Sequence, residues 1–205
     1  MKIQVAIDRV TIAQAIEIME EVQASADIIE IGTSLIKDYG MEAIRSIRKA
    51  FPDIKILADI KTMDEAEYEF RAGYRAGADI LTVMGAASMA SIEICREIAS
   101  EYQKEYLIDL LEVSADKTRE LKKFKDAIFC VHLPADKDGA GLKELVEKSS
   151  RELTGCPRLA AAGGVRRNTL SIIKECGYEI AIVGGAITKS ENRRETAKAF
   201  YGEAR

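Results

Sequence analysis

The chain has 205 residues, of which 47% are hydrophobic and 31% charged, and this composition is typical of a single globular domain. The net charge is −4 and the basic residues are scattered, which argues against nucleic acid as a partner. No apolar stretch reaches membrane-spanning length and the first eight residues already resemble a strand, so we expect no membrane segment, no signal peptide and a cytoplasmic location. The four cysteines lie far apart without a C-x-x-C pair, which predicts reduced, packed thiols.

Short apolar strands alternate with amphipathic helices along the whole chain. Strands are predicted near residues 3–8, 26–31, 54–60, 78–84, 105–111, 126–132, 158–162 and 179–184, each followed by a helical segment. This α/β alternation predicts a single-domain (β/α)8 TIM barrel over residues 1–205. An open doubly wound sheet remains the alternative, because a strand count does not show closure.

A weak internal repeat supports the barrel. Acids or glycines end the odd-numbered strands, and acids precede the even-numbered strands, in both cases about every 50 residues. The acids that precede the even strands are Asp27, Asp79, Asp126 and Glu179. One interval corresponds to one βαβα unit, and four such units fill the chain.

The third predicted strand runs directly into charged residues with the spacing D-x-K-x-x-D, namely Asp59, Lys61 and Asp64. Charges at the end of a buried strand are costly unless they pair or bind something. These three side chains are therefore candidates for chemistry, and the simpler interpretation is an ion pair that closes the strand.

Acids also end other predicted strands. In a barrel the carboxyl ends of all strands open on one face, where the active site lies. Asp8, Glu30, Asp59 and Asp109 would meet there, with Lys61 as the single lysine among the strand ends. Carboxylates that converge without paired thiols or several histidines predict a divalent cation, Mg²⁺ in preference to zinc.

His132, the only histidine, ends the sixth predicted strand. A single histidine at such a position is often a structural hydrogen-bonding residue. Its placement on the same rim as the acids favours a role in proton transfer, because its side chain ordinarily titrates near neutral pH.

Two glycine pairs follow the seventh and eighth predicted strands: Gly163-Gly164 and Gly184-Gly185. Barrels commonly bind phosphate at these positions through exposed backbone N–H groups. The glycines therefore predict a phosphorylated substrate, although each pair by itself is also typical of a tight turn.

Several of these stretches together resemble one known family. They are Val5-Ala6-Ile7-Asp8, Asp27–Thr33, Ala58–Asp64, Gly77-Ala78-Asp79, Ala162-Gly163-Gly164 and Val183–Ile187. They are similar to the 3-hexulose-6-phosphate synthases and to their relatives, the 3-keto-L-gulonate-6-phosphate decarboxylases, within the orotidine-monophosphate decarboxylase suprafamily. The resemblance covers nearly the whole chain, and D-x-K-x-x-D is its most specific motif.

The resemblance implies a homodimer of barrels in which Asp64 reaches into the partner's active site. It implies Glu30 and Asp59 as Mg²⁺ ligands, Lys61 as the group that stabilises an enediolate, and Asp8, Asp109 and His132 around the reacting carbons. The expected reaction is a condensation of a phosphorylated ketose, D-ribulose 5-phosphate, with formaldehyde. The alternatives are the decarboxylase and a phosphosugar-binding barrel without turnover. We also expect the aromatic residues of the stretch 65–70 to pack against the partner.

The segment after His132 departs from the family pattern. The synthases resemble H-x-G-x-D-x-Q, whereas this chain has Pro134 at the glycine, keeps Asp136, and has Asp138 at the glutamine. The decarboxylases resemble H-x-x-R-D, and Ala135 stands at the arginine. The missing arginine favours the synthase over the decarboxylase, while the altered loop leaves the substrate open.

Overall fold

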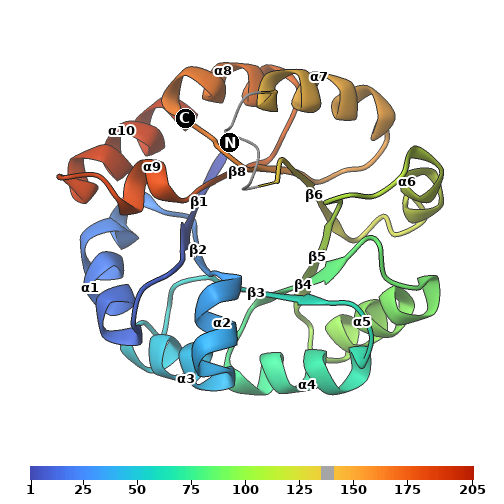
Figure 1. The fold of residues 1–205 in the computed structure, drawn as a ribbon, viewed down its shortest axis with the longest axis horizontal. Coiled ribbons are helices and arrows are strands. Elements are labelled where there is room, and N and C mark those ends of the chain that lie inside the picture. Colours follow the sequence, from blue (N-terminus) through green and yellow to red (C-terminus); the bar gives the residue numbers. More distant parts are fainter. Residues whose placement is uncertain (135–140) are drawn as a thin grey trace.

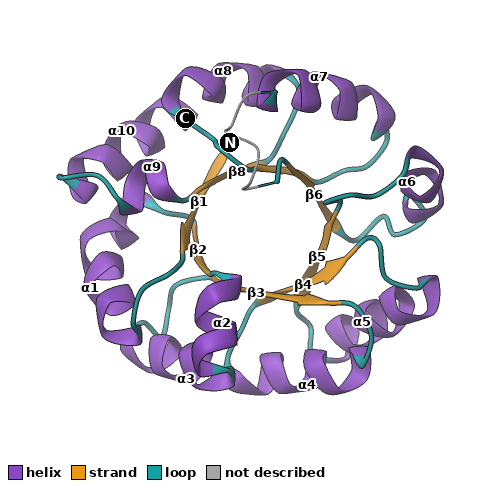
Figure 2. Ribbon diagram, viewed as in Figure 1, coloured by secondary structure: helices purple, strands orange, loops and turns teal. Residues whose placement is uncertain are grey.

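Eight parallel strands form a closed barrel in the computed structural model, which describes residues 1–134 and 141–205. Figures 1 and 2 show the ring of strands inside a ring of helices, with β1 beside β8. The strands are β1 (Lys2–Ile7), β2 (Ile28–Ile31), β3 (Ile56–Thr62), β4 (Ile80–Met84), β5 (Glu105–Asp109), β6 (Ile128–His132), β7 (Leu159–Ala162) and β8 (Ile180–Val183). Closure confirms the predicted (β/α)8 barrel and excludes the open sheet.

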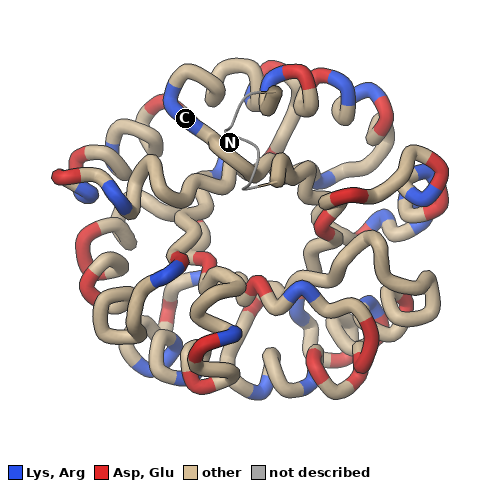
Figure 3. Tube along the Cα trace, viewed as in Figure 1, with Lys and Arg blue, Asp and Glu red and all other residues tan. Residues whose placement is uncertain are grey.

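The helices follow the strands, as the sequence predicted, and two further short helices lie beside the barrel. They are α1 (Ile12–Val22) with the 3₁₀ turn η1 (Gln23–Ser25), α2 (Thr33–Tyr39), α3 (Met41–Ala50), α4 (Ala66–Ala76), α5 (Met89–Glu101), α6 (Ala115–Leu121), α7 (Leu142–Glu152), α8 (Arg167–Glu175), α9 (Gly185–Thr188) and α10 (Arg193–Ala204). The extra helices are α2, which contacts β3, and α9, which contacts β1. Within the described ranges, no helix is both long and apolar enough to cross a membrane. Figure 3 shows charges of both signs spread over the outer helices.

The barrel separates two hydrophobic cores. The larger core lies between the strands and the helices. The smaller core fills the barrel interior with Ala6, Ile28, Leu57, Ile80, Leu107, Ile128, Cys130, Ala160, Ala162, Ile180 and Ile182. Each even-numbered strand begins with one of these isoleucines, so the predicted repeat of four βαβα units is visible in the interior packing.

The cysteines behave as the sequence predicted. Cys95 and Cys130 are buried, Cys156 and Cys176 are partly buried, and all four are free thiols. Burial raises the pKa of Cys95 to about 12 and that of Cys130 well above its usual range. Neutral, packed thiols of this kind are poor nucleophiles.

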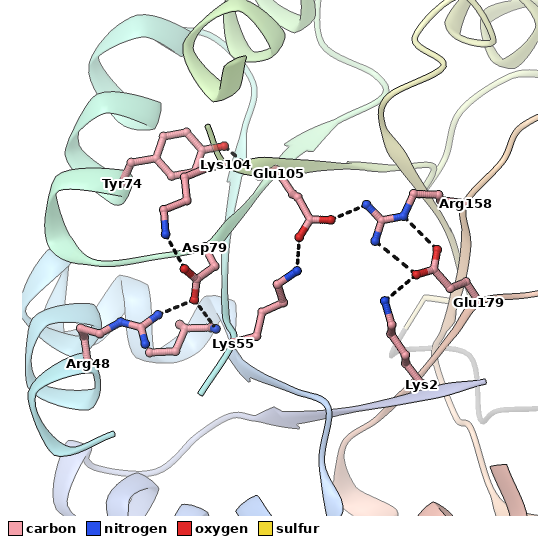
Figure 4. Close-up of polar contacts among 10 residues, drawn as sticks. Lys2, Arg48, Lys55, Tyr74, Asp79, Lys104, Glu105, Arg158 and Glu179 are labelled. Atoms are coloured by element: carbon pink, nitrogen blue, oxygen red, sulfur yellow. Dashed lines mark hydrogen bonds and ion pairs between the residues drawn. The ribbon is translucent and has the colours of Figure 1, made fainter. Parts of the chain in front are cut away.

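Ion pairs connect the strands at the opposite end of the barrel from the predicted active site. Figure 4 shows Arg158 between Glu105 and Glu179, with Lys55 on Glu105 and Lys2 on Glu179. These residues lie at or next to the first residues of β1, β3, β5, β7 and β8. The charged side chains therefore close the amino-terminal end of the barrel while the other end stays open.

The repeat also determines how this end is built. The acid before each even-numbered strand forms an ion pair with an arginine, in the pairs Arg205–Asp27, Arg48–Asp79, Arg96–Asp126 and Arg158–Glu179. Asp27 and Asp79 also accept the backbone N–H of Ile3 and Ile56, at 2.8 and 2.9 Å. These two acids thus complete backbone hydrogen bonding where the neighbouring strand begins.

Asp79 makes the densest of these contacts, so we expect Asp79→Ala to destabilise the fold by about 2–4 kcal/mol. The substitution removes the carboxylate that pairs with Arg48 and Lys104 and that accepts the Ile56 N–H. Urea unfolding measures the change. The control is Asp116→Asn, which breaks an exposed pair with Arg119 and should cost less than about 0.5 kcal/mol. Equal costs for the two variants would contradict a structural role for the Asp79 cluster.

Candidate active site

A cavity of about 870 Å³ opens at the carboxyl ends of the strands. It is lined by all but one of the predicted site residues: Asp8, Glu30, Asp59, Lys61, Asp109, His132, Gly163, Gly164, Gly184 and Gly185. The exception is Asp64, which is exposed just beyond the end of β3 and does not line the cavity of its own chain. The sequence therefore placed ten of the eleven side chains or glycines at one mouth.

An irregularity in β3 places Lys61. The pairing of β3 with β4 shifts register between Ala58 and Thr62, and β3 extends two residues beyond its predicted end. Lys61 has a φ of 49°, and its N–H donates to Thr82 Oγ1 at 2.9 Å. Bulges of this kind redirect side chains, and a left-handed lysine costs about 1–3 kcal/mol unless its surroundings hold it.

The Lys61 ammonium lies between two carboxylates. Its Nζ is 2.7 Å from Asp109 Oδ2 and 3.1 Å from Asp59 Oδ2. Burial acts to lower the pKa of Lys61, but the negative charges of Asp59 and Asp109 outweigh burial and raise that pKa above its usual range. Lys61 is therefore a fixed positive charge inside the cavity.

Asp109 joins Lys61 to the only histidine. Its Oδ2 is 2.9 Å from His132 Nδ1, and its Oδ1 accepts the N–H of Leu111 at 2.9 Å. Burial acts to raise the pKa of Asp109, but hydrogen bonding and charge from His132 and Lys61 lower it to about 2. An ionised Asp109 orients the imidazole through Nδ1, which leaves Nε2 as the nitrogen available to a ligand.

Asp59 and Glu30 line the cavity from the neighbouring strands β3 and β2. Thr33 Oγ1 and Thr82 Oγ1 donate to the two oxygens of Asp59, at 2.6 and 2.8 Å. Glu30 is only 8% exposed and accepts a hydrogen bond from Gln4 Nε2 at 2.5 Å. Burial and then the charge of Asp59 raise the pKa of Glu30 from 4.5 to about 8. The ammonium beside this pair of acids, that of Lys61, is shared between Asp59 and Asp109, so the charges of the acids are only partly compensated.

The raised pKa gives a signed prediction for Glu30→Gln in chelated buffer. Between about pH 5 and about pH 8, native Glu30 holds a proton that the unfolded chain has released, so its contribution to stability falls as pH rises. The melting temperature of Glu30→Gln relative to wild type should therefore increase across this range, by about 2–4 °C for each kcal/mol. Calorimetry measures it, with the exposed substitution Glu120→Gln as the control for charge removal. A difference that is flat in pH would contradict the perturbed carboxyl.

Asp8 lies apart from this network. It is exposed, and its Oδ1 accepts from Ser34 Oγ at 2.8 Å and from Ser34 N–H at 3.3 Å. The carboxylate packs over Gly32, where an added Cβ would lie 2.3 Å from it. Asp8 is thus fixed by the start of α2 rather than by Lys61 or His132.

The glycines fall into two groups. Gly163 has a φ of 90°, and a Cβ there would lie 2.1 Å from the carbonyl oxygen of Leu133, so close packing alone requires glycine. At Gly184 and Gly185 a Cβ would lie no closer than 3.7 Å to Ala6 and 3.5 Å to Lys189. A Cβ at either position would therefore make only ordinary contacts, and both glycines line the cavity.

Sequence reasoning missed several residues that line the cavity. They are Gln4, Arg9, Thr33, Ser34, Lys37, Thr82, Arg166 and Lys189. The four cations among them follow β1, β2, β7 and β8, which are consecutive around the closed barrel, and none pairs with a carboxylate of residues 1–134 or 141–205. Gln4 and Thr82 could have been found in the sequence, because each is a polar side chain flanked by apolar residues within its strand. The four cations could not have been singled out in the sequence, because basic residues also occur throughout the helices.

The altered loop lies largely outside the described residues. Pro134 is described, whereas Ala135, Asp136, Asp138 and Gly139 are not. The sequence differences at these positions remain observations on the sequence alone.

A closed parallel barrel with acids, a lysine and a histidine at the carboxyl ends of its strands has the architecture of the (β/α)8 enzymes. Residues 1–200 match the family described as orotidine 5'-phosphate decarboxylase / HUMPS. The chain belongs to this family.

The relatives to which this chain is similar include 3-hexulose-6-phosphate synthases and a 3-keto-L-gulonate-6-phosphate decarboxylase. The 3-hexulose-6-phosphate synthase of Bacillus subtilis (strain 168) is 35% identical over 200 residues, 96% of this chain and 95% of that protein. The synthase of Methylomonas aminofaciens is 34% identical over 207 residues, 98% of each chain. A crystal structure of 3-hexulose-6-phosphate synthase from Salmonella typhimurium superposes with a TM-score of 0.92 at 30% identity, over 100% of this chain and 98% of that one. The 3-keto-L-gulonate-6-phosphate decarboxylase of Vibrio cholerae O1 gives 0.88 at 25% identity, over 99% and 96%.

Proposed function

We propose that the chain is an aldolase of the 3-hexulose-6-phosphate synthase type, which condenses D-ribulose 5-phosphate with formaldehyde through an enediolate. The observation that carries the proposal is the network Asp59–Lys61–Asp109–His132 at one mouth, which combines a fixed positive charge with a proton-transfer group. The synthases at 34–35% identity support this reaction over the decarboxylase.

The residues divide the work of forming an enediolate. His132 Nε2 removes the proton from C1 of the ketose, while Asp109 holds the imidazole in place. The Lys61 ammonium stabilises the negative charge that develops on the enediolate oxygens, in a cavity where the charge is already in position. The enediolate carbon then attacks formaldehyde, and the alkoxide that results takes up a proton.

Glu30 and Asp59 fit Mg²⁺. Their oxygens are hard ligands, and a cation would neutralise two acids that share only part of the charge of Lys61. The described residues hold no cluster of three or more histidines, cysteines or acids placed to bind a metal. Two carboxylates suffice for Mg²⁺, which keeps several waters and takes substrate oxygens as further ligands. When bound, the ion would supply electrostatic stabilisation of the enediolate.

Asp64 supports a homodimer with shared active sites. Its side chain is exposed and lies outside the cavity of its own chain, next to two exposed hydrophobic residues, Met63 at 48% and Tyr68 at 73%. Our expectation for the aromatic residues is wrong for Phe70, which is 0% exposed and belongs to the core of its own chain, because α4 turns that side chain inward. The dimer surface that we propose therefore contains Met63 and Tyr68 and reaches Asp64.

One comparison tests the activity. The purified protein is assayed with Mg²⁺ on ribulose 5-phosphate plus formaldehyde and, in parallel, on 3-keto-L-gulonate 6-phosphate, each with Lys61→Ala as the control. We expect turnover of the first mixture, loss with EDTA and recovery with added Mg²⁺. Turnover of the second substrate alone would favour the decarboxylase. Ligand-dependent thermal stabilisation without turnover of either would favour a binding protein.

Gly185→Val tests the phosphate site. A Cβ at this position meets only ordinary contacts in the protein, so we expect the fold to survive and the added methyl groups to obstruct the phosphate. The KM for the phosphosugar should rise by about 10-fold or more, and kcat should fall as well, because phosphate binding holds the reacting carbons in place. Inorganic phosphate should also lose its competition with substrate. Unchanged KM together with persistent phosphate competition would move the phosphate site elsewhere.

A further inference from the structure

A buried amide interrupts the apolar packing of the barrel interior. Gln4 is 0% exposed and pairs in register with the first residue of β2. The equivalent pairs of the other three repeats are Leu57 with Ile80, Leu107 with Ile128 and Ala160 with Ile180. Three repeats therefore place hydrocarbon where the first places an amide. Burying an amide is costly unless its hydrogen bonds are made, so those bonds explain why Gln4 stands there.

The amide nitrogen of Gln4 already has a hydrogen-bond partner. Gln4 Nε2 donates to Glu30 Oε2 at 2.5 Å, which is the one side-chain hydrogen bond that the described residues give Glu30. Both side chains are buried, so this bond decides which way the carboxylate faces. Glu30 itself lies two residues further along the barrel axis, at the level of the cavity.

The amide oxygen of Gln4 has no hydrogen-bond partner among the described residues. Gln4 Oε1 is the buried side-chain polar atom that finds no donor among residues 1–134 and 141–205, and Gln4 lines the floor of the cavity. Leaving a buried acceptor without a donor destabilises the folded protein. A molecule that brings a hydrogen-bond donor into the cavity would satisfy this acceptor.

We propose that Gln4 is a positioning residue for the cation site. It holds the Glu30 carboxylate toward the cavity through Nε2, and through Oε1 it accepts a hydrogen bond from a water of the hydrated cation. This inference rests on the proposed function, in which Glu30 binds Mg²⁺. Loss of an outer partner of this kind typically lowers metal affinity or activity by about 10–100-fold.

Calorimetric titration with Mn²⁺, a stand-in for Mg²⁺, tests the inference without turnover. We expect Gln4→Leu, which restores the apolar ring, to bind Mn²⁺ about 10–100-fold more weakly than wild type. The matched control is Leu107→Met, which alters packing in the same ring and leaves the polar contacts of Gln4 in place, so its Mn²⁺ affinity should stay within about 2-fold. Thermal melts establish that the variants are folded, and Gln4→Met replaces Gln4→Leu if the latter does not fold. In the kinetic assay kcat should fall more than KM for the phosphosugar rises.

A double-mutant cycle shows whether Gln4 acts through Glu30. In a Glu30→Gln background, Gln4→Leu should weaken Mn²⁺ binding by less than about 3-fold further, because its partner is already gone. Full additivity, or unchanged Mn²⁺ affinity in folded Gln4→Leu, would overturn the inference while leaving the proposed function intact. A wild-type protein that binds no Mn²⁺ would overturn the metal assignment and the inference together.

Discussion

His132→Ala should reduce turnover by about 10²–10⁴-fold, the usual effect of losing a positioned acid or base. His132 Nδ1 is held 2.9 Å from Asp109, whose carboxylate is ionised, so the imidazole presents Nε2 to the substrate. Because the phosphate site that we propose uses backbone N–H groups of the glycines after β7 and β8 rather than the imidazole, the KM for the phosphosugar should change much less than kcat. Steady-state kinetics with ribulose 5-phosphate and formaldehyde measure both.

A second measurement separates proton removal from the later carbon–carbon step. Wild-type protein should exchange the C1 proton of ribulose 5-phosphate with D₂O in the absence of formaldehyde, and His132→Ala should lose that exchange. The matched variant is His132→Gln, whose amide can still donate to Asp109 but cannot act as the base at C1, and it should be equally slow. Near-normal exchange in His132→Ala would return the histidine to a structural role and make Asp8 or Asp109 the better candidate for the base.

Mixing two inactive variants, Asp64→Ala and Lys61→Ala, should restore about a quarter of wild-type activity. Each homodimer lacks one essential group at both sites. If Asp64 completes the partner's site, a mixed dimer holds one intact site and one doubly damaged site, and random exchange makes about half of the dimers mixed. Activity is followed after the variants have been unfolded and refolded together in equal amounts.

The control for this experiment is a mixture of Lys61→Ala with His132→Ala. Both residues line the cavity of the same chain, so a mixed dimer has no intact site and should stay inactive. Tagged subunits establish that exchange has occurred. Exchange without recovery in the Asp64→Ala mixture would exclude a shared site, and recovery in the control mixture would show that complementation does not report on Asp64.

The fold follows from the sequence because it depends on local patterns. Each strand is a short apolar run followed by a helical segment, and the observed strand ends differ from the predicted ones by at most two residues. The acids before the even strands recur because each βαβα unit pairs its acid with an arginine, and Asp27 and Asp79 also accept a backbone N–H where the neighbouring strand begins. Once all strands are parallel and closed, their carboxyl ends must share one mouth, and for this reason the candidate residues at those ends were correctly gathered.

The sequence by itself thus determined the barrel and the place of ten of the eleven predicted site residues at its mouth. Hydrophobic periodicity and strand ends can be recognised from consecutive residues, without knowledge of tertiary contacts. Only the tertiary structure decided the left-handed turn at Lys61, the amide of Gln4 beneath Glu30, the inward position of Phe70 and the exclusion of Asp64 from its own cavity. These features depend on register between strands and on which face of a helix packs inward. A shift of one residue in register reverses the direction of every side chain, so contacts of this kind exist only after the barrel has closed.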